Sequence, residues 1–192
     1  MQRRSVLTAM GLCAVAAAAT PAAAEPMQVP VIWDGKKMWD TFSENAIGFS
    51  KPGRAGRARA YVAFDTQCSD CIRLLKHIRP LLDDIDVVWC PVAFMGIHSE
   101  PQGATMLASR DPWAKFVEHH DTFVGRKPRG ITYDARALSE EVRTAVWTNT
   151  KLHRRCGCRS VPFGVFKNSR GEYCPFDNNL TRDELKKLFE LR

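Results

Sequence analysis

The chain has 192 residues, of which 45% are hydrophobic, and its 28 basic and 21 acidic side chains give a net charge of +7. This length suits one main globular domain, since domains usually hold about 100–200 residues. The modest basic excess lacks a stripe of interleaved basic and aromatic residues, so we assign no nucleic-acid partner.

The first 24 residues differ in kind from the rest. Arg3 and Arg4 precede an apolar, alanine-rich run over 6–19, and small residues continue to Ala24. The run is too short to span a bilayer, so the pattern predicts a secretory signal peptide over 1–24. The paired arginines also resemble a twin-arginine export signal, and both export routes stay open. Removal of this segment lowers the net charge to +5.

Residues 25–58 predict a lead-in helix and loop, with an amphipathic stretch over 29–47 that covers one face of the core. The segment 59–65 predicts a central strand. A helix follows over about 69–83, and Pro80 is expected to kink or end its last turn. The β-branched segment 86–95 predicts a second buried strand, parallel to the first because a helix connects them.

Residues 99–155 are too long for one crossover helix. Helical periodicity over 102–109, 111–124 and 139–153 predicts an inserted helical subdomain instead.

The C-terminal part of the chain has the pattern of a hairpin followed by a helix. The segments 161–167 and 172–176 flank a short polar turn and predict two antiparallel strands. Thr181 and Glu184 predict a capping box at the start of the last helix.

Two thiols, Cys68 and Cys71, lie where the first strand meets its helix. Unpaired N–H groups and partial positive charge at a helix start stabilise a thiolate, here on Cys68. Cys71 lies one turn further in and can resolve a mixed disulfide that Cys68 forms. Between them, the Asp70 carboxylate is expected to raise the pKa of Cys68 and to favour a more reducing couple.

The order of these elements is that of a thioredoxin-like domain. We therefore expect an α/β thioredoxin-like fold over 59–192, with a mixed sheet between helices and the helical insertion at about 99–155. The chain resembles, over roughly 36–191, the catalytic domain of the periplasmic thiol:disulfide interchange proteins DsbC and DsbG. The segments that carry this resemblance are 64–71, 91–96, 108–113 and 161–166.

The resemblance implies a periplasmic disulfide isomerase or reductase in which Cys68 attacks a client disulfide and Cys71 resolves the intermediate. Its redox-active disulfide would be the only cofactor. The resemblance also implies that Pro162 is cis, which would bring the Val161 backbone to the sulfurs, where an extended client can pair with it. The expected partners are exported clients and a membrane thiol-redox protein that resets the pair. The predicted substrate-binding residues are Val161, Ser69 and Asp70.

The chain departs from this family in three ways, one of which is the Ser69-Asp70 dipeptide between the two cysteines. The N-terminal dimerisation domain is missing, so we expect a monomer. Val161 stands where the isomerases usually carry threonine, and valine is what the related oxidases carry. A dithiol oxidase and a non-catalytic thiol-binding or metal-binding module of the same fold therefore remain as alternative functions.

The remaining cysteines are predicted to be structural. Cys13 is expected to leave with the signal peptide. One of Cys156 and Cys158 is expected to form a disulfide with Cys174 or Cys90, although sequence does not choose among the connectivities. Cys90 could equally be an inert buried thiol. We predict no metal, the competing hypothesis being a four-thiolate site of Cys68, Cys71, Cys156 and Cys158.

Two further kinds of polar residue bear on the site. Asp65 ends the first strand and is either a proton acceptor for Cys71 or a turn residue that hydrogen-bonds the start of the helix, and we favour the turn role. The histidines lack a metal-ligand spacing and are expected to be solvated or to cap helices. They include His98, His119, His120 and His153.

Overall fold

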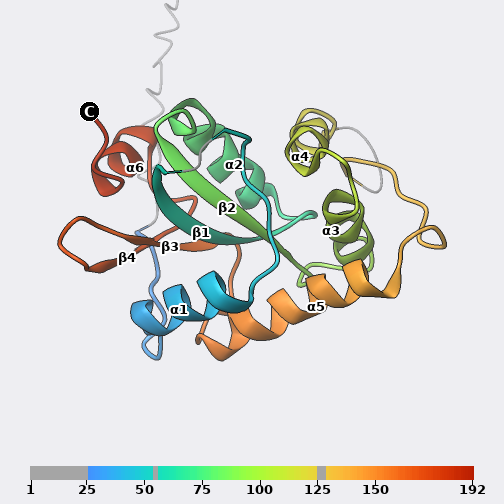
Figure 1. Ribbon diagram of the computed structural model, residues 1–192, viewed down its shortest axis with the longest axis horizontal. Coiled ribbons are helices and arrows are strands. Elements are labelled where there is room, and N and C mark those ends of the chain that lie inside the picture. Colours follow the sequence, from blue (N-terminus) through green and yellow to red (C-terminus); the bar gives the residue numbers. More distant parts are fainter. Residues whose placement is uncertain (1–25, 54–55, 125–128) are drawn as a thin grey trace, which may run out of the picture.

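The computed structural model describes residues 26–53, 56–124 and 129–192, so the predicted signal peptide over 1–24 lies outside the described residues. A four-stranded mixed sheet in the order β2-β1-β3-β4 forms the centre of the fold (Figure 1). Parallel pairing joins β1 and β2, and antiparallel pairing joins β1 to β3 and β3 to β4. The strands are β1 (Ala58–Asp65), β2 (Ile85–Val92), β3 (Phe163–Lys167) and β4 (Tyr173–Phe176).

Helices cover both faces of this sheet (Figure 1). The first face carries α2 (Ser69–Ile78), its 3-10 continuation η1 (Arg79–Leu81) and α6 (Arg182–Leu188). The second face carries α1 (Gly35–Asn45) and α5 (Glu140–Arg155). Between β2 and α5 the chain forms α3 (Ser99–Leu107) and α4 (Pro112–Asp121). The predicted mixed sheet between helices, with extra helices inserted before the hairpin, is confirmed.

The central strand β1 explains why the core has two parts. Side chains alternate between the faces of a strand, so Val62 and Phe64 pack toward α2 whereas Tyr61 and Ala63 pack toward α1. All four are buried. Burial on both faces accounts for the continuous apolar run from which the strand was predicted.

Local signals fix where the helices begin and end. Thr181 and Glu184 form the predicted capping box of α6. Pro80 lies in the first turn of η1, where its missing N–H costs no helical hydrogen bond, and the α-helix ends just before it as predicted. None of the helices in the described part of the chain is long and apolar enough to cross a membrane.

Candidate active site

The Cys68 side chain is itself the N-cap of α2. Its Sγ accepts a hydrogen bond from the Cys71 backbone N–H at 3.4 Å, which satisfies one of the free donors of the first helical turn. The Cys68 thiol also donates to the Val161 carbonyl oxygen at 3.4 Å. Cys68 keeps 4% of its surface exposed and Cys71 keeps none, so Cys68 is the sulfur of the pair that can be reached from outside.

The two thiols of the pair titrate in opposite directions. Hydrogen bonding from the Cys71 side chain lowers the pKa of Cys68, the backbone N–H groups of Cys71 and Asp70 lower it further, and burial opposes them. For Cys71, burial is the main cause and raises the pKa of its thiol well above the usual range. The site therefore stabilises a thiolate on Cys68 and keeps Cys71 protonated behind it.

The predicted effect of the Asp70 charge on Cys68 is confirmed in direction, since that charge raises the pKa of Cys68. The net shift of Cys68 is nevertheless downward, because the hydrogen bonds to the sulfur outweigh both this charge and burial. Arg73, one turn along α2, forms an ion pair with the Asp70 carboxylate at 2.8 Å.

The loop before β3 faces the sulfurs. The Val161–Pro162 peptide bond is cis, which confirms the prediction for Pro162. Pro162 is buried and Val161 half-buried. Among the other predicted substrate-binding residues, Ser69 is exposed and Asp70 half-buried, both in the first turn of α2. The structure thus gathers the predicted residues around Cys68.

Asp65 is a completely buried carboxylate beneath this pair. Its Oδ1 accepts the Gln67 backbone N–H at 2.8 Å, which confirms the predicted turn role, and also the Ser99 hydroxyl at 2.7 Å. Its Oδ2 accepts the backbone N–H groups of Phe94 and Met95 at 2.6 and 2.9 Å. The links to the loop after β2 and to α3 were not predicted, although parallel strands end at one edge of a sheet and place such groups side by side.

Two histidines are buried, contrary to the prediction that they would be solvated or capping. His119 lies in α4, where Nδ1 accepts the Ile131 N–H and Nε2 is 2.8 Å from the Thr66 carbonyl oxygen. This arrangement requires a neutral ring that donates from Nε2. Burial lowers the pKa of His119 to about 4. His119 thereby holds the loop between β1 and Cys68 from the side of α4.

The other buried histidine, His153, lies near the end of α5. Its Nε2 is 2.9 Å from the Ser160 carbonyl oxygen, one residue before Val161. Burial lowers the pKa of His153, likewise to about 4. The contact of His98 with the Tyr133 hydroxyl is partly buried, and the contact of His120 with Asp121 is exposed at the surface.

The predicted structural disulfide is wrong: all six cysteines in the described part of the chain are free thiols. Cys156 and Cys158 are buried in the part of the core next to α1, together with Cys90. Cys174 lies on the same face of β4 as Phe176, which packs toward α2 and α6, so the sheet separates it from Cys156 and Cys158.

The sheet also separates Cys156 and Cys158 from Cys68 and Cys71, which belong to the α2 side of the core. The competing four-thiolate metal site is therefore not assembled. Among the described residues, no group of three or more His, Cys, Asp or Glu side chains could hold a metal ion.

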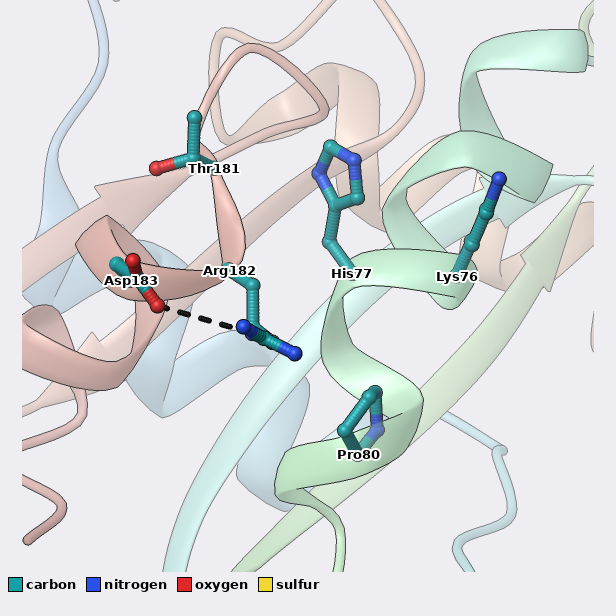
Figure 2. Close-up of a pocket in the computed structure, with 6 residues that line it drawn as sticks. All are labelled: Lys76, His77, Pro80, Thr181, Arg182 and Asp183. Carbon is teal, nitrogen blue, oxygen red and sulfur yellow. Dashed lines mark ion pairs between the residues drawn. The ribbon is translucent and has the colours of Figure 1, made fainter.

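A groove of about 340 Å³ lies at the other end of α2, and Figure 2 shows the side chains that line it. Lys76, His77 and Pro80 come from α2 and η1, and Arg182 pairs with Asp183 across from them at 3.6 Å. This groove is two helical turns from Cys68 and contributes nothing to the chemistry of the sulfurs.

Neither a protein-family model nor a curated protein sequence matches this chain. Solved structures do match by fold. A periplasmic thioredoxin-like protein from Salmonella enterica serovar Typhimurium gives a TM-score of 0.63 at 15% identity, over 85% of this chain and 97% of that one. The catalytic domain of ScsC from Proteus mirabilis gives 0.59 at 18% identity, over 81% and 96%.

DsbG from Helicobacter pylori gives a TM-score of 0.51 at 21% identity, over 68% of this chain and 61% of that one. Identities this low carry information about the fold alone. Together with the mixed sheet, the C-x-x-C pair at the start of α2 and the cis proline before β3, they show that this chain has a thioredoxin-like fold.

Proposed function

We propose that the protein is an exported thiol:disulfide oxidoreductase that acts as an isomerase or reductase on disulfides of other exported proteins. One observation carries this proposal. Cys68 caps α2 with a lowered pKa, and Cys71 stands buried directly behind it with a raised pKa. Thiol–disulfide exchange needs this difference, because the attacking sulfur must be a thiolate and the resolving thiol must stay protonated until the mixed disulfide has formed.

The proposed reaction begins when the Cys68 thiolate attacks one sulfur of a client disulfide. A mixed disulfide forms, and the other client sulfur leaves as a thiolate that takes up a proton. Cys71 then loses its proton and attacks the Cys68 sulfur, which releases the second client thiol. Two electrons pass to the client, and the protein is left with a Cys68–Cys71 disulfide. Isomerisation uses the first step and its reversal at a different client sulfur.

Val161 is proposed to hold the client during this exchange. Its carbonyl oxygen already lies 3.4 Å from the Cys68 Sγ, so an extended client segment that pairs with this backbone places its own sulfur at Cys68. Repeated reduction requires an external supply of electrons, which we assign to a membrane thiol-redox partner. The periplasmic source named for the Salmonella protein and the predicted signal peptide support a periplasmic location.

A second candidate function, a dithiol oxidase of the same fold, is favoured by the lowered pKa of Cys68. A stabilised thiolate stabilises the reduced form of the pair, which makes the disulfide a better oxidant. Val161 points the same way, since valine before the proline is the residue expected of the oxidases.

A redox titration of the mature protein against glutathione tests the choice between these functions. A potential near about −230 mV or below supports the reductase or isomerase, and one near about −120 mV supports the oxidase. Recovery of a scrambled disulfide protein measures isomerisation directly. If Cys68→Ala protein recovers the scrambled disulfide protein as fast as the wild type does, both proposals fail and a non-catalytic binding module remains.

A further inference from the structure

A pocket of about 250 Å³ is lined by residues that lie next to Cys68 in the chain or contact its sulfur. One wall is formed by Asp70 and by Val161 with Pro162. Asp70 is two residues beyond Cys68 in the same helical turn, and Val161 is the residue whose carbonyl oxygen contacts the Cys68 Sγ. A client segment that reaches Cys68 along Val161 therefore passes the mouth of this pocket.

The turn after β4 also lines the pocket, with Asp177, Asn178 and Asn179. Asp177 keeps only 7% of its surface exposed. Its Oδ1 accepts the Asn179 backbone N–H at 2.8 Å, and its Oδ2 has a long contact of 3.4 Å with the Asn179 side-chain nitrogen. A carboxylate has about four acceptor positions, so Asp177 keeps acceptor capacity for a donor that enters the pocket.

The charge of the pocket is opposite to that of the protein. Two carboxylates line it, and the lining residues within the described ranges include no Lys or Arg, although the whole chain carries +7. Arg73 already pairs with Asp70, so Asp177 supplies most of the uncompensated charge. Burial raises the pKa of Asp177, and the charge of Asp70 raises it further. A cation placed between the two carboxylates would offset both effects.

We propose that this pocket binds a Lys or Arg side chain of the client within one or two residues of the client cysteine. The inference rests on the proposed exchange reaction, because the client cysteine must be at Cys68 when its neighbour enters the pocket. An extended segment advances about 3.3 Å per residue, so the neighbour of the reacting cysteine lies within reach of the pocket. Asp177 is then a specificity-determining residue.

The test uses reduced mature protein and two symmetric disulfide-linked peptide dimers. The peptides are identical except that one carries Arg beside its cysteine and the other carries citrulline, its neutral counterpart of nearly the same shape. Each exchange oxidises the Cys68–Cys71 pair and releases two peptide thiols. The second-order rate constant of each dimer is divided by its rate constant with dithiothreitol, which removes the intrinsic effect of Arg on cysteine reactivity.

The wild-type protein should prefer the Arg dimer by about three- to fivefold at low salt, the size expected of a partly exposed ion pair. The preference should shrink toward one in about 1 M salt, where screening acts over about 3 Å, and in Asp177→Asn. The matched control Asp183→Asn removes the same charge from the groove in Figure 2 and should keep the preference.

Equal normalised rates of the two dimers with wild-type protein would overturn the pocket assignment, and this comparison needs no variant to fold. A preference that survives in folded Asp177→Asn would overturn the role of Asp177. If neither dimer oxidises the Cys68–Cys71 pair while dithiothreitol reduces both dimers, the proposed exchange function itself fails, which separates the two claims.

Discussion

The two closely spaced cysteine pairs occupy opposite kinds of helix end. Cys68 and Cys71 begin α2, whereas Cys156 is the C-cap of α5 and Cys158 follows it. A helix start offers free N–H groups and positive charge to a sulfur, and a helix end offers carbonyl groups and negative charge. The pKa of Cys68 is lowered by hydrogen bonding from the Cys71 side chain and then by the N–H groups of the first turn, while burial raises the pKa of Cys158 to about 12. These residues are all cysteines, so their position in the fold decides which thiol can react.

Each pair also has its own buried histidine. His119 reaches the Thr66 carbonyl before Cys68, and His153 reaches the Ser160 carbonyl after Cys158. Because these loops end on either side of the sulfur–Val161 contact, the neutral histidines fix the two halves of the site from opposite faces of the sheet.

Replacement of one cysteine in each pair should give the largest difference, measured as the rate of disulfide exchange. Cys68→Ser should lower the rate of disulfide exchange by about 10³-fold or more, because a serine hydroxyl is not a competent nucleophile toward sulfur near neutral pH. Cys158→Ser should leave the rate within about twofold, provided that the protein folds, which circular dichroism checks. Reduction of an insulin disulfide by each variant measures the rate, and a comparable loss in both variants would remove the distinction.

Alkylation should separate the same thiols by at least about tenfold in rate. At pH 7 the reduced native protein should react with iodoacetamide first at Cys68, because the thiolate is the reacting species. Cys90, Cys156 and Cys158 should react only after unfolding, since burial raises the pKa of each. Peptide mapping by mass spectrometry reads each site. Disulfides mapped among these cysteines in the purified protein would contradict the free thiols of the structure.

Asp65→Asn should lower the stability of the sheet edge next to Cys68 and Cys71. Both carboxylate oxygens accept hydrogen bonds, so an amide nitrogen in place of either one would face N–H or O–H donors. We expect a loss of about 1–3 kcal/mol of unfolding free energy, measured by urea denaturation. Asp134→Asn, at an exposed turn, is the matched control. An unchanged stability of Asp65→Asn would mean that these contacts are not maintained in solution.

Acidification should lower the unfolding free energy gradually through His119 and His153, and this is the smallest of the expected effects. Their folded pKa values of about 4 lie below the usual value of about 6.5, so between these pH values the unfolded chain binds protons that the folded chain does not. Unfolding free energy should therefore fall as the pH drops from 6.5 to 4, by up to about 1.4 kcal/mol per pH unit for each histidine. His119→Gln should show a flatter profile than the wild type in urea titrations at several pH values.

Local patterns were enough to predict the sheet, most helices and the place of Cys68 and Cys71 at the start of α2, whereas the approach of Val161 and Pro162 to the sulfurs was predicted from the family resemblance. Alternation, capping residues and the C-x-x-C position are properties of neighbouring residues, which sequence displays directly. The direction of the effect of the Asp70 charge on Cys68 was also predicted, because the two residues share one helical turn. The net pKa of Cys68 was not, because it depends on hydrogen bonds to the sulfur that only the folded first turn of α2 provides.

The remaining errors depend on contacts between distant segments. The burial of His119 follows from the packing of α4 against the loop after β1, and no pattern within α4 reveals its carbonyl partner at Thr66. The free state of Cys174 follows from its face of β4, which depends on strand register. Asp177 was not predicted as a site residue because only the folded chain brings the turn after β4 to Val161.

Pro26 is one of the residues that line the pocket next to Val161. A substitution at Pro26 would therefore reshape the surface that a client meets beside Val161, although Pro26 is distant in sequence from both cysteines. A purification tag attached after Arg192, beyond α6, would leave every residue that lines this pocket unchanged.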